Sequence, residues 1–122
     1  MSQVLIHEPR PEIDECRDWL AGEGHDVVVC RDREDLLSAL ALRRPDLVVY
    51  VLEEQRLDLR VLSLVRRLAP TLPIIVLAAP SGLELRRAVQ ELRPTYYGVL
   101  PLEPTELAEA VRCALEPHDA RG

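Results

Sequence analysis

The sequence contains no lysine and no phenylalanine. All 15 basic residues are arginine, and aromatic residues make up only 3% of the 122-residue chain. The missing lysines exclude any mechanism that depends on an ammonium side chain. The missing phenylalanines mean that a core drawn from the 48% of hydrophobic residues must be aliphatic, built from Leu, Val, Ile and Ala.

Acidic residues outnumber basic residues in the chain, by 21 to 15. Its net charge is −6 and its isoelectric point is near 5.1. Nucleic-acid binding needs basic residues gathered on one face, so the composition argues against a nucleic-acid partner. The N-terminus has the pattern of neither a signal peptide nor a membrane span. We therefore expect a soluble cytoplasmic domain without membrane contact.

Cysteine and glycine are both scarce. Cys16, Cys30 and Cys113 are odd in number and far apart, which indicates neither a disulfide framework nor a zinc site. We expect all three to be small buried hydrophobic residues. Glycine-rich phosphate-binding motifs are absent, so flavin, dinucleotide and nucleoside triphosphate cofactors are not indicated. The expectation is a protein without cofactor or metal.

Short apolar runs alternate with segments of helical periodicity. Continuous apolarity is typical of parallel strands that are covered on both faces. The pattern predicts an α/β fold, a five-stranded parallel sheet with helices on both faces. One domain would cover residues 1–116, with a polar tail or the start of a linker at 117–122. The expected strands cover residues 4–6, 27–30, 47–51, 74–79 and 96–100, and the apolar stripes of the expected helices cover 13–20, 36–40, 61–68, 85–92 and 107–114.

Two local features refine this prediction. Ser81 and Glu84 have the spacing of a capping box at the start of the fourth helix. His7 and Glu8 follow the first strand, at the edge where parallel sheets form their sites. No third ligand or nucleophile accompanies this pair, so we expect His7 to be a loop residue that faces water.

Three segments resemble a known family. RRPDLVVYV, LPIIVLAA and YYGVLPLEPTEL are similar to the third, fourth and fifth strand regions of the receiver domain of bacterial response regulators, which is the CheY-like family. In that family these regions usually read PDLVLLD, PVIVLTA and DYLVKPFDPEEL. The resemblance covers essentially the whole chain. It implies the flavodoxin-like strand order 2-1-3-4-5 and a role in two-component, phosphorelay signal transduction.

The resemblance also locates the family's phosphorylation site. In receiver domains an acidic pair holds a magnesium ion, an aspartate accepts the phosphoryl group, and a hydroxyl and a lysine complete the site. The corresponding residues here are Glu8 and Pro9, Val51, Ala78 and Leu100. Phosphoryl transfer needs a nucleophilic oxygen, a hard cation and a positive charge for the developing anion. The resemblance therefore implies a degenerate pseudo-receiver without catalytic residues, and not an enzyme.

Other carboxylates are weak substitutes for the missing aspartate. Asp46 lies at the wrong end of the third strand, and Asp58 is expected within the third helix. Glu53 and Glu54 lie just past the strand. The lysine and the cation ligands are also missing. A regulator that accepts a phosphoryl group on one of these carboxylates is therefore the least favoured alternative.

The favoured function is phosphorylation-independent recognition of protein partners in a signalling pathway, or homodimerisation. The resemblance places the contact face on the fourth helix, fifth strand and fifth helix. The alternative is a sensor that binds a small hydrophobic ligand in the altered pocket at Val51, Ala78 and Leu100. The candidate interface residues are Arg86, Arg87, Glu91, Tyr96, Tyr97, Glu106, Glu109 and Arg112.

Overall fold

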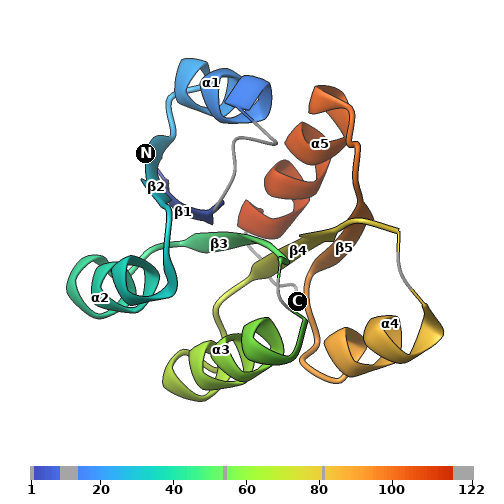
Figure 1. Ribbon diagram of the computed structural model, residues 1–122. Helices are drawn as coiled ribbons and strands as arrows, with labels where there is room; N and C mark the ends of the chain where they lie inside the picture. The colour runs from blue at the N-terminus through green and yellow to red at the C-terminus, as the bar shows by residue number, and fades with distance from the viewer. Residues whose placement is uncertain (1, 9–13, 54, 81, 117–122) are drawn as a thin grey trace.

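The protein is a three-layer α/β domain with one parallel sheet at its centre (Figure 1). The computed structural model describes residues 2–8, 14–53, 55–80 and 82–116. Strands and helices alternate along the chain from the first strand to the last helix. The elements are β1 (Gln3–His7), α1 (Asp14–Gly22), β2 (Asp26–Cys30), α2 (Arg33–Arg43), β3 (Leu47–Val51), α3 (Gln55–Leu68), β4 (Ile74–Ala78), α4 (Leu83–Gln90), β5 (Tyr96–Val99) and α5 (Pro104–Leu115).

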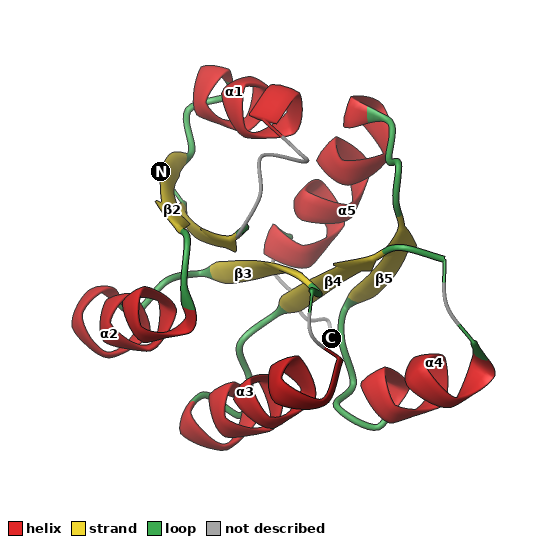
Figure 2. Cartoon of the chain, in the orientation of Figure 1, coloured by secondary structure: helices red, strands yellow, loops and turns green. Residues whose placement is uncertain are grey.

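The sheet has the strand order β2-β1-β3-β4-β5, and every pairing is parallel. This confirms the predicted fold class and strand order. Helices α1 and α5 cover one face of the sheet, and α2, α3 and α4 cover the other (Figure 2). The strand order reverses beside β1 and β3, so the carboxyl ends of these two strands form the expected site edge.

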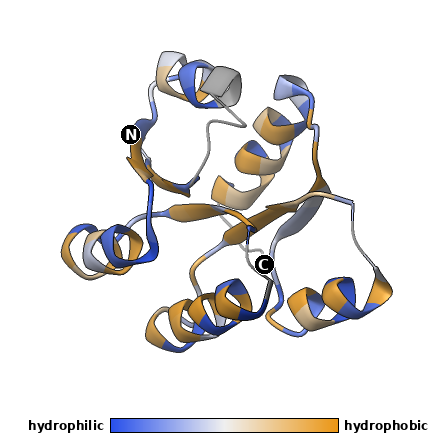
Figure 3. Ribbon diagram, viewed as in Figure 1, coloured by the Kyte–Doolittle hydropathy of each residue, from blue (hydrophilic) through white to orange (hydrophobic). Residues whose placement is uncertain are grey.

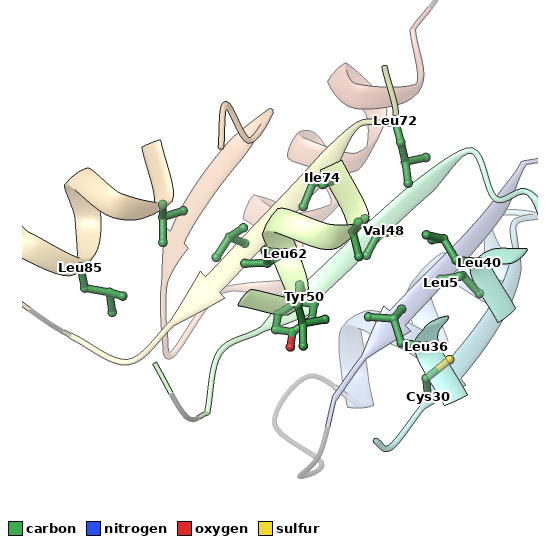
Figure 4. Close-up of a cluster of buried hydrophobic side chains, with 14 residues drawn as sticks. Leu5, Cys30, Leu36, Leu40, Val48, Tyr50, Leu62, Leu72, Ile74 and Leu85 are labelled. Carbon is green, nitrogen blue, oxygen red and sulfur yellow. The ribbon is translucent and has the colours of Figure 1, made fainter. Parts of the chain in front are cut away.

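The strands are apolar along their length because both faces are covered. All five residues of β3 and all five of β4 are buried. Figure 3 shows these strands in the colour of hydrophobic residues, whereas the helices are apolar on one side only. The core on the α1–α5 face is built around Val49, Ile75 and Leu107, and that on the opposite face around Leu5, Val48 and Leu62 (Figure 4). As predicted, aliphatic residues dominate both.

Helix boundaries follow local chemistry. Asp32 caps α2, its carboxylate accepting a hydrogen bond of 2.8 Å from the Asp35 amide. Pro104 occupies the first turn of α5, where its missing N–H costs nothing. At α4 the predicted capping box is wrong: Gly82 is the N-cap and makes no side-chain hydrogen bond, so Glu84 lies one position too early in the helix. Ser81 itself lies outside the described residues.

The cysteines do not share one environment. Cys30 is buried at the end of β2, as expected. Cys113 is exposed on α5, so the prediction that it is buried is wrong. It lies on the outer side of the helix, beyond the stripe formed by Leu107, Ala110 and Val111. The side chain of Cys16 lies outside the described residues.

None of the helices in the described parts of the chain is long and apolar enough to cross a membrane. The predicted polar tail at 117–122 lies outside the described residues.

Gly98 in β5 provides a test of core packing. A methyl group at Gly98 would lie 2.8 Å from Cδ2 of Leu77 and 3.0 Å from Cε2 of Tyr96. Because Leu77 is fully buried and has little room to move, we expect Gly98→Ala to lower the free energy of unfolding by about 1–2 kcal/mol. Urea denaturation measures this change. Gly22→Ala is the matched control, because its methyl group meets no atom within 4 Å, and equal destabilisation by both would contradict the packing explanation.

Candidate functional site at the carboxyl edge of the sheet

The residues at the receiver phosphorylation positions lie together and are apolar. Val51 ends β3 and Ala78 ends β4, and both side chains are buried. Leu100 follows β5, and its amide donates a 2.8 Å hydrogen bond to the carbonyl of Ala78. Val51 belongs to the core around Leu77, and Leu100 packs against that same core. Three neighbouring strands thus bring these residues to one edge, where they extend the hydrophobic core. Pro9 lies outside the described residues.

Receiver domains hold magnesium with a pair of acidic residues, and Glu8 is the only acidic residue at the two corresponding positions in this chain. Its side chain is fully buried, and its Oε1 atom lies 3.7 Å from Nη1 of Arg31. The same Arg31 nitrogen donates a 3.1 Å hydrogen bond to the Glu8 carbonyl. A guanidinium therefore already supplies positive charge to this carboxylate.

The magnesium ion of the receiver family does not fit this set of residues. Val51 and Ala78 offer no side-chain oxygen, and Arg31 opposes a second cation beside Glu8. Within the described ranges no group of three or more His, Cys, Asp and Glu side chains is placed to hold a metal ion.

A polar network that the sequence did not predict lies beside this edge, on the side of α2 and α3. At its centre is Asp58 of α3, whose carboxylate is fully buried. Its Oδ1 accepts hydrogen bonds of 2.6 Å from the Tyr50 hydroxyl and 3.2 Å from Nε of Arg33, and its Oδ2 accepts one of 2.6 Å from the Glu53 amide. The carboxylate thus joins β3, α2 and the β3–α3 loop. We name Asp58, Tyr50, Arg33 and the Glu53 amide the Asp58 network.

His7 lies against this network and does not face water. The prediction of an exposed loop residue is wrong, because β1 extends through His7 and its side chain points to the same face as Leu5. The ring is buried and stacks on Tyr50, with ring centroids 4.2 Å apart and planes at 21°. Neither ring nitrogen makes a hydrogen bond of full geometry among the described residues, although the backbone of Val51 lies close enough to the ring to favour its protonated form.

Burial sets the ionisation of both rings. The pKa of His7 is lowered, chiefly by desolvation and also by the charge of Arg33, although the carboxylates of Asp58 and Glu53 act in the opposite direction. The pKa of Tyr50 is raised far above its usual value, first by burial and then by its hydrogen bond to Asp58. Both groups are therefore neutral near pH 7, and Tyr50 acts only as a hydrogen-bond donor.

The sequence does contain a signal for the Asp58 network. Asp58 occurs at the spacing of the buried residues Val61, Leu62 and Val65, so it lies in the middle of the apolar stripe of α3. A buried carboxylate requires donors, and Tyr50 on the facing strand is one such donor.

The predicted interface residues line the other side of the domain, on α4, β5 and α5. The Arg86 guanidinium lies 5.8 Å from the centre of the Tyr97 ring, and the Tyr96 hydroxyl donates a hydrogen bond to Glu106. Arg112 and Glu109 form an exposed ion pair of 3.1 Å. Arg87 and Glu91 border a shallow hollow on the outer side of α4. Arg112 itself lies towards α1, because it lines a hollow together with Trp19 and His25. We name the surface formed by the other seven residues the α4–β5–α5 face.

Comparison with known proteins identifies the fold. A response regulator receiver domain protein (CheY-like) from Methanospirillum hungatei JF-1 superposes with a TM-score of 0.88 at 19% identity, covering 100% of this chain and 99% of the other. A response regulator from Thermotoga maritima gives 0.85 at 18% identity, with 94% and 98% coverage. At these identities the likeness establishes the receiver fold.

Similarity in sequence to a curated protein covers only part of each chain. The probable transcriptional regulator ycf27 of Porphyridium aerugineum is 34% identical over 96 residues, which cover 79% of this chain. The chain spans about 40% of the length of that curated relative. No protein-family model matches the chain.

The Asp58 network can be tested by removing its acceptor. Asp58→Ala leaves Arg33 and two further donors without their acceptor in a buried site, so we expect a loss of about 3 kcal/mol in the free energy of unfolding. Urea denaturation measures it. Glu109→Ala, which breaks only the exposed ion pair with Arg112, should cost less than about 0.5 kcal/mol. Similar losses in both variants would show that the network has no special role.

His7 predicts a pH dependence of stability. Because its folded pKa lies below the unfolded value of about 6.5, the unfolded chain binds more protons between these two values. The stability that comes from burying neutral His7 is complete above about pH 6.5 and declines as the pH falls towards the folded pKa. His7→Phe keeps a ring against Tyr50 and should reduce this decline, whereas His25→Gln should not. Urea midpoints between pH 7 and 5 measure the difference, and parallel curves for His7→Phe and wild type would refute the assignment.

Proposed function

We propose that this receiver-like domain of the two-component response-regulator type acts as a cytoplasmic protein-interaction or dimerisation module, without aspartyl phosphorylation and without enzymatic activity. The observation that carries the proposal is the apolar set Val51, Ala78 and Leu100 at the carboxyl edge. A phosphoryl group there would meet no nucleophile and no lysine. It would also have to enter a hydrophobic core, where a charged group is strongly unfavourable.

The remaining carboxylates near this edge support the same view. Asp58 is fully buried and accepts three hydrogen bonds, so its lone pairs are engaged and its carboxylate is not presented to a donor. Glu8 lies beside Arg31 and is also buried. A non-standard phosphoacceptor at either position would have to break a buried polar arrangement first.

The α4–β5–α5 face is the surface that we propose for partner recognition or for a homodimer. It combines exposed apolar residues, Leu83 and Val99, with arginine and glutamate side chains. Self-complementary charges of this kind suit a two-fold contact, in which each arginine meets a glutamate of the other copy. Tyr97 is held under Arg86 at the surface, so the face has a defined shape without a phosphoryl signal.

The sensor alternative receives no comparable support. Val51 and Ala78 are buried by their own neighbours, and Leu100 packs onto the same core. Side chains thus occupy the space that a small hydrophobic ligand would need.

The test is incubation of the purified chain with acetyl phosphate and magnesium, followed by intact-protein mass spectrometry. We expect no phosphoryl adduct, because the described residues at this edge include no carboxylate that belongs to a group able to hold a metal ion. Sedimentation velocity, with and without acetyl phosphate, should give the same oligomeric state. A receiver domain that becomes phosphorylated under these conditions is the positive control. An adduct, or a magnesium-dependent change of oligomeric state with beryllofluoride, would overturn the proposal.

A further inference from the structure

The outer side of α3 exposes a line of leucines. Leu57, Leu64 and Leu68 have 42%, 41% and 63% of their surface exposed. They are spaced seven and four residues apart, so they lie on one side of the helix. The described part of the chain exposes seven large hydrophobic residues, and α3 carries three of them. Isolated exposed leucines are ordinary, but an aligned set marks a surface that is suited to a contact.

The line of leucines lies on the side of α3 that faces α2. Arg66 lies on the opposite side of α3, where its guanidinium donates hydrogen bonds to the carbonyls of Leu92 and Arg93, towards β5. Helical geometry then places Leu57, Leu64 and Leu68 on the α2 side. Leu68 also lines a groove of about 640 Å³ together with residues of α2 and of the turn before β4. Figure 1 shows α2 and α3 as neighbours on this face of the sheet.

This groove is deep enough for side chains and largely apolar. Its apolar lining comes from Leu40 and Ala41 on one wall and Leu68 and Ala69 on the other, with Leu72 between them. It lies at the amino-terminal edge of the sheet, away from Val51 and Ala78. It also lies on a different side of the domain from the α4–β5–α5 face.

The outward surface of α3 is strongly basic. Arg56, Arg60 and Arg67 are exposed, and none of them makes a hydrogen bond or ion pair within the described ranges. Asp58 is the only acidic residue of α3, and it is buried in the Asp58 network. A basic helix stands out on a chain whose net charge is −6. Its charges are therefore available to a partner of opposite sign.

We propose that the α2–α3 face, made of Leu57, Leu64, Leu68, the groove and the three arginines, binds an acidic amphipathic helix of a partner protein. Leucine-like side chains of that helix would occupy the groove and the leucine line, and its carboxylates would meet Arg56, Arg60 and Arg67. The inference rests on the proposed interaction role and names the chemistry of one partner. The groove favours a helix over an anionic membrane, because a helix can insert side chains into a groove whereas a bilayer presents a broad surface.

The experiment uses three fluorescent 16-residue peptides and the full chain. The first is an amphipathic helix with leucines at i, i+3, i+4 and i+7 and glutamates elsewhere. The second has lysine in place of glutamate, and the third is a scrambled form of the first. Fluorescence anisotropy at low salt should show binding of the first peptide at least tenfold tighter than that of the other two.

Four variants locate the contact. Leu64→Ser with Leu68→Ser, and Arg60→Glu with Arg67→Glu, should each weaken binding of the acidic peptide at least tenfold. The matched controls are Leu42→Ser, which changes an 84% exposed leucine on the far side of α2, and Arg93→Glu, which changes an exposed arginine in the turn between α4 and β5. Both controls should bind within about twofold of wild type. All substituted positions are exposed, and circular dichroism checks that each variant is folded.

Each other result overturns the inference. Equal binding of the acidic and lysine peptides, or loss of binding in the Arg93→Glu control, would remove the α2–α3 face as the site. Binding of phosphatidylserine vesicles without binding of the acidic peptide would assign the face to a membrane. Self-association that the Leu64/Leu68 variant abolishes would assign it to a second copy. If the acidic peptide does not bind and the chain takes up no phosphoryl group, only this inference is rejected. If the chain takes up a phosphoryl group, only the proposed function is rejected.

Discussion

Burial of a parallel sheet on both faces is the constraint from which the rest of this structure follows. Helices α1 and α5 cover one face and α2, α3 and α4 the other, so β3 and β4 must be apolar along their length. Polar function is thereby restricted to the ends of the strands and to the outer sides of the helices. At the ends of β3 and β4 this chain again carries apolar residues, Val51 and Ala78, so the hydrophobic core extends to the carboxyl edge of the sheet.

The arrangement of strands could be predicted because each strand has its own local pattern. Runs such as 47–51 and 74–79 are continuously apolar, the first preceded by Asp46 and the second flanked by Pro73 and Pro80, so their position did not depend on any distant contact. The same locality explains why Val51, Ala78 and Leu100 could be placed at one edge: each follows from where its own strand ends. The predicted cap of α4 is wrong by one residue, because the helix follows Gly82 and the spacing of Ser81 and Glu84 alone does not fix where the first turn begins.

The Asp58 network could not be predicted in this way. Asp58 meets a hydroxyl 8 residues away and a guanidinium 25 residues away, and these partners come together only when α2, β3 and α3 have packed. His7 was misplaced for a related reason. Its exposure depends on whether β1 ends before or after it, and the structure extends the strand by that one residue and stacks the ring on Tyr50. Tertiary contacts decide whether a polar residue at a strand end is buried or exposed, and a single sequence does not display these contacts.

The bond between Asp58 and the Glu53 amide has a further consequence for motion. A switch domain needs a second conformation that lies only a few kcal/mol above the first, and a mobile loop usually provides it. Here the β3–α3 loop is tied through one carboxylate to the buried end of β3 and to the start of α2. Opening the loop would break the bond to the Glu53 amide and expose a desolvated carboxylate, which costs on the order of 1–3 kcal/mol. The loop beside the apolar edge is therefore anchored by the same carboxylate that ties β3 to α2.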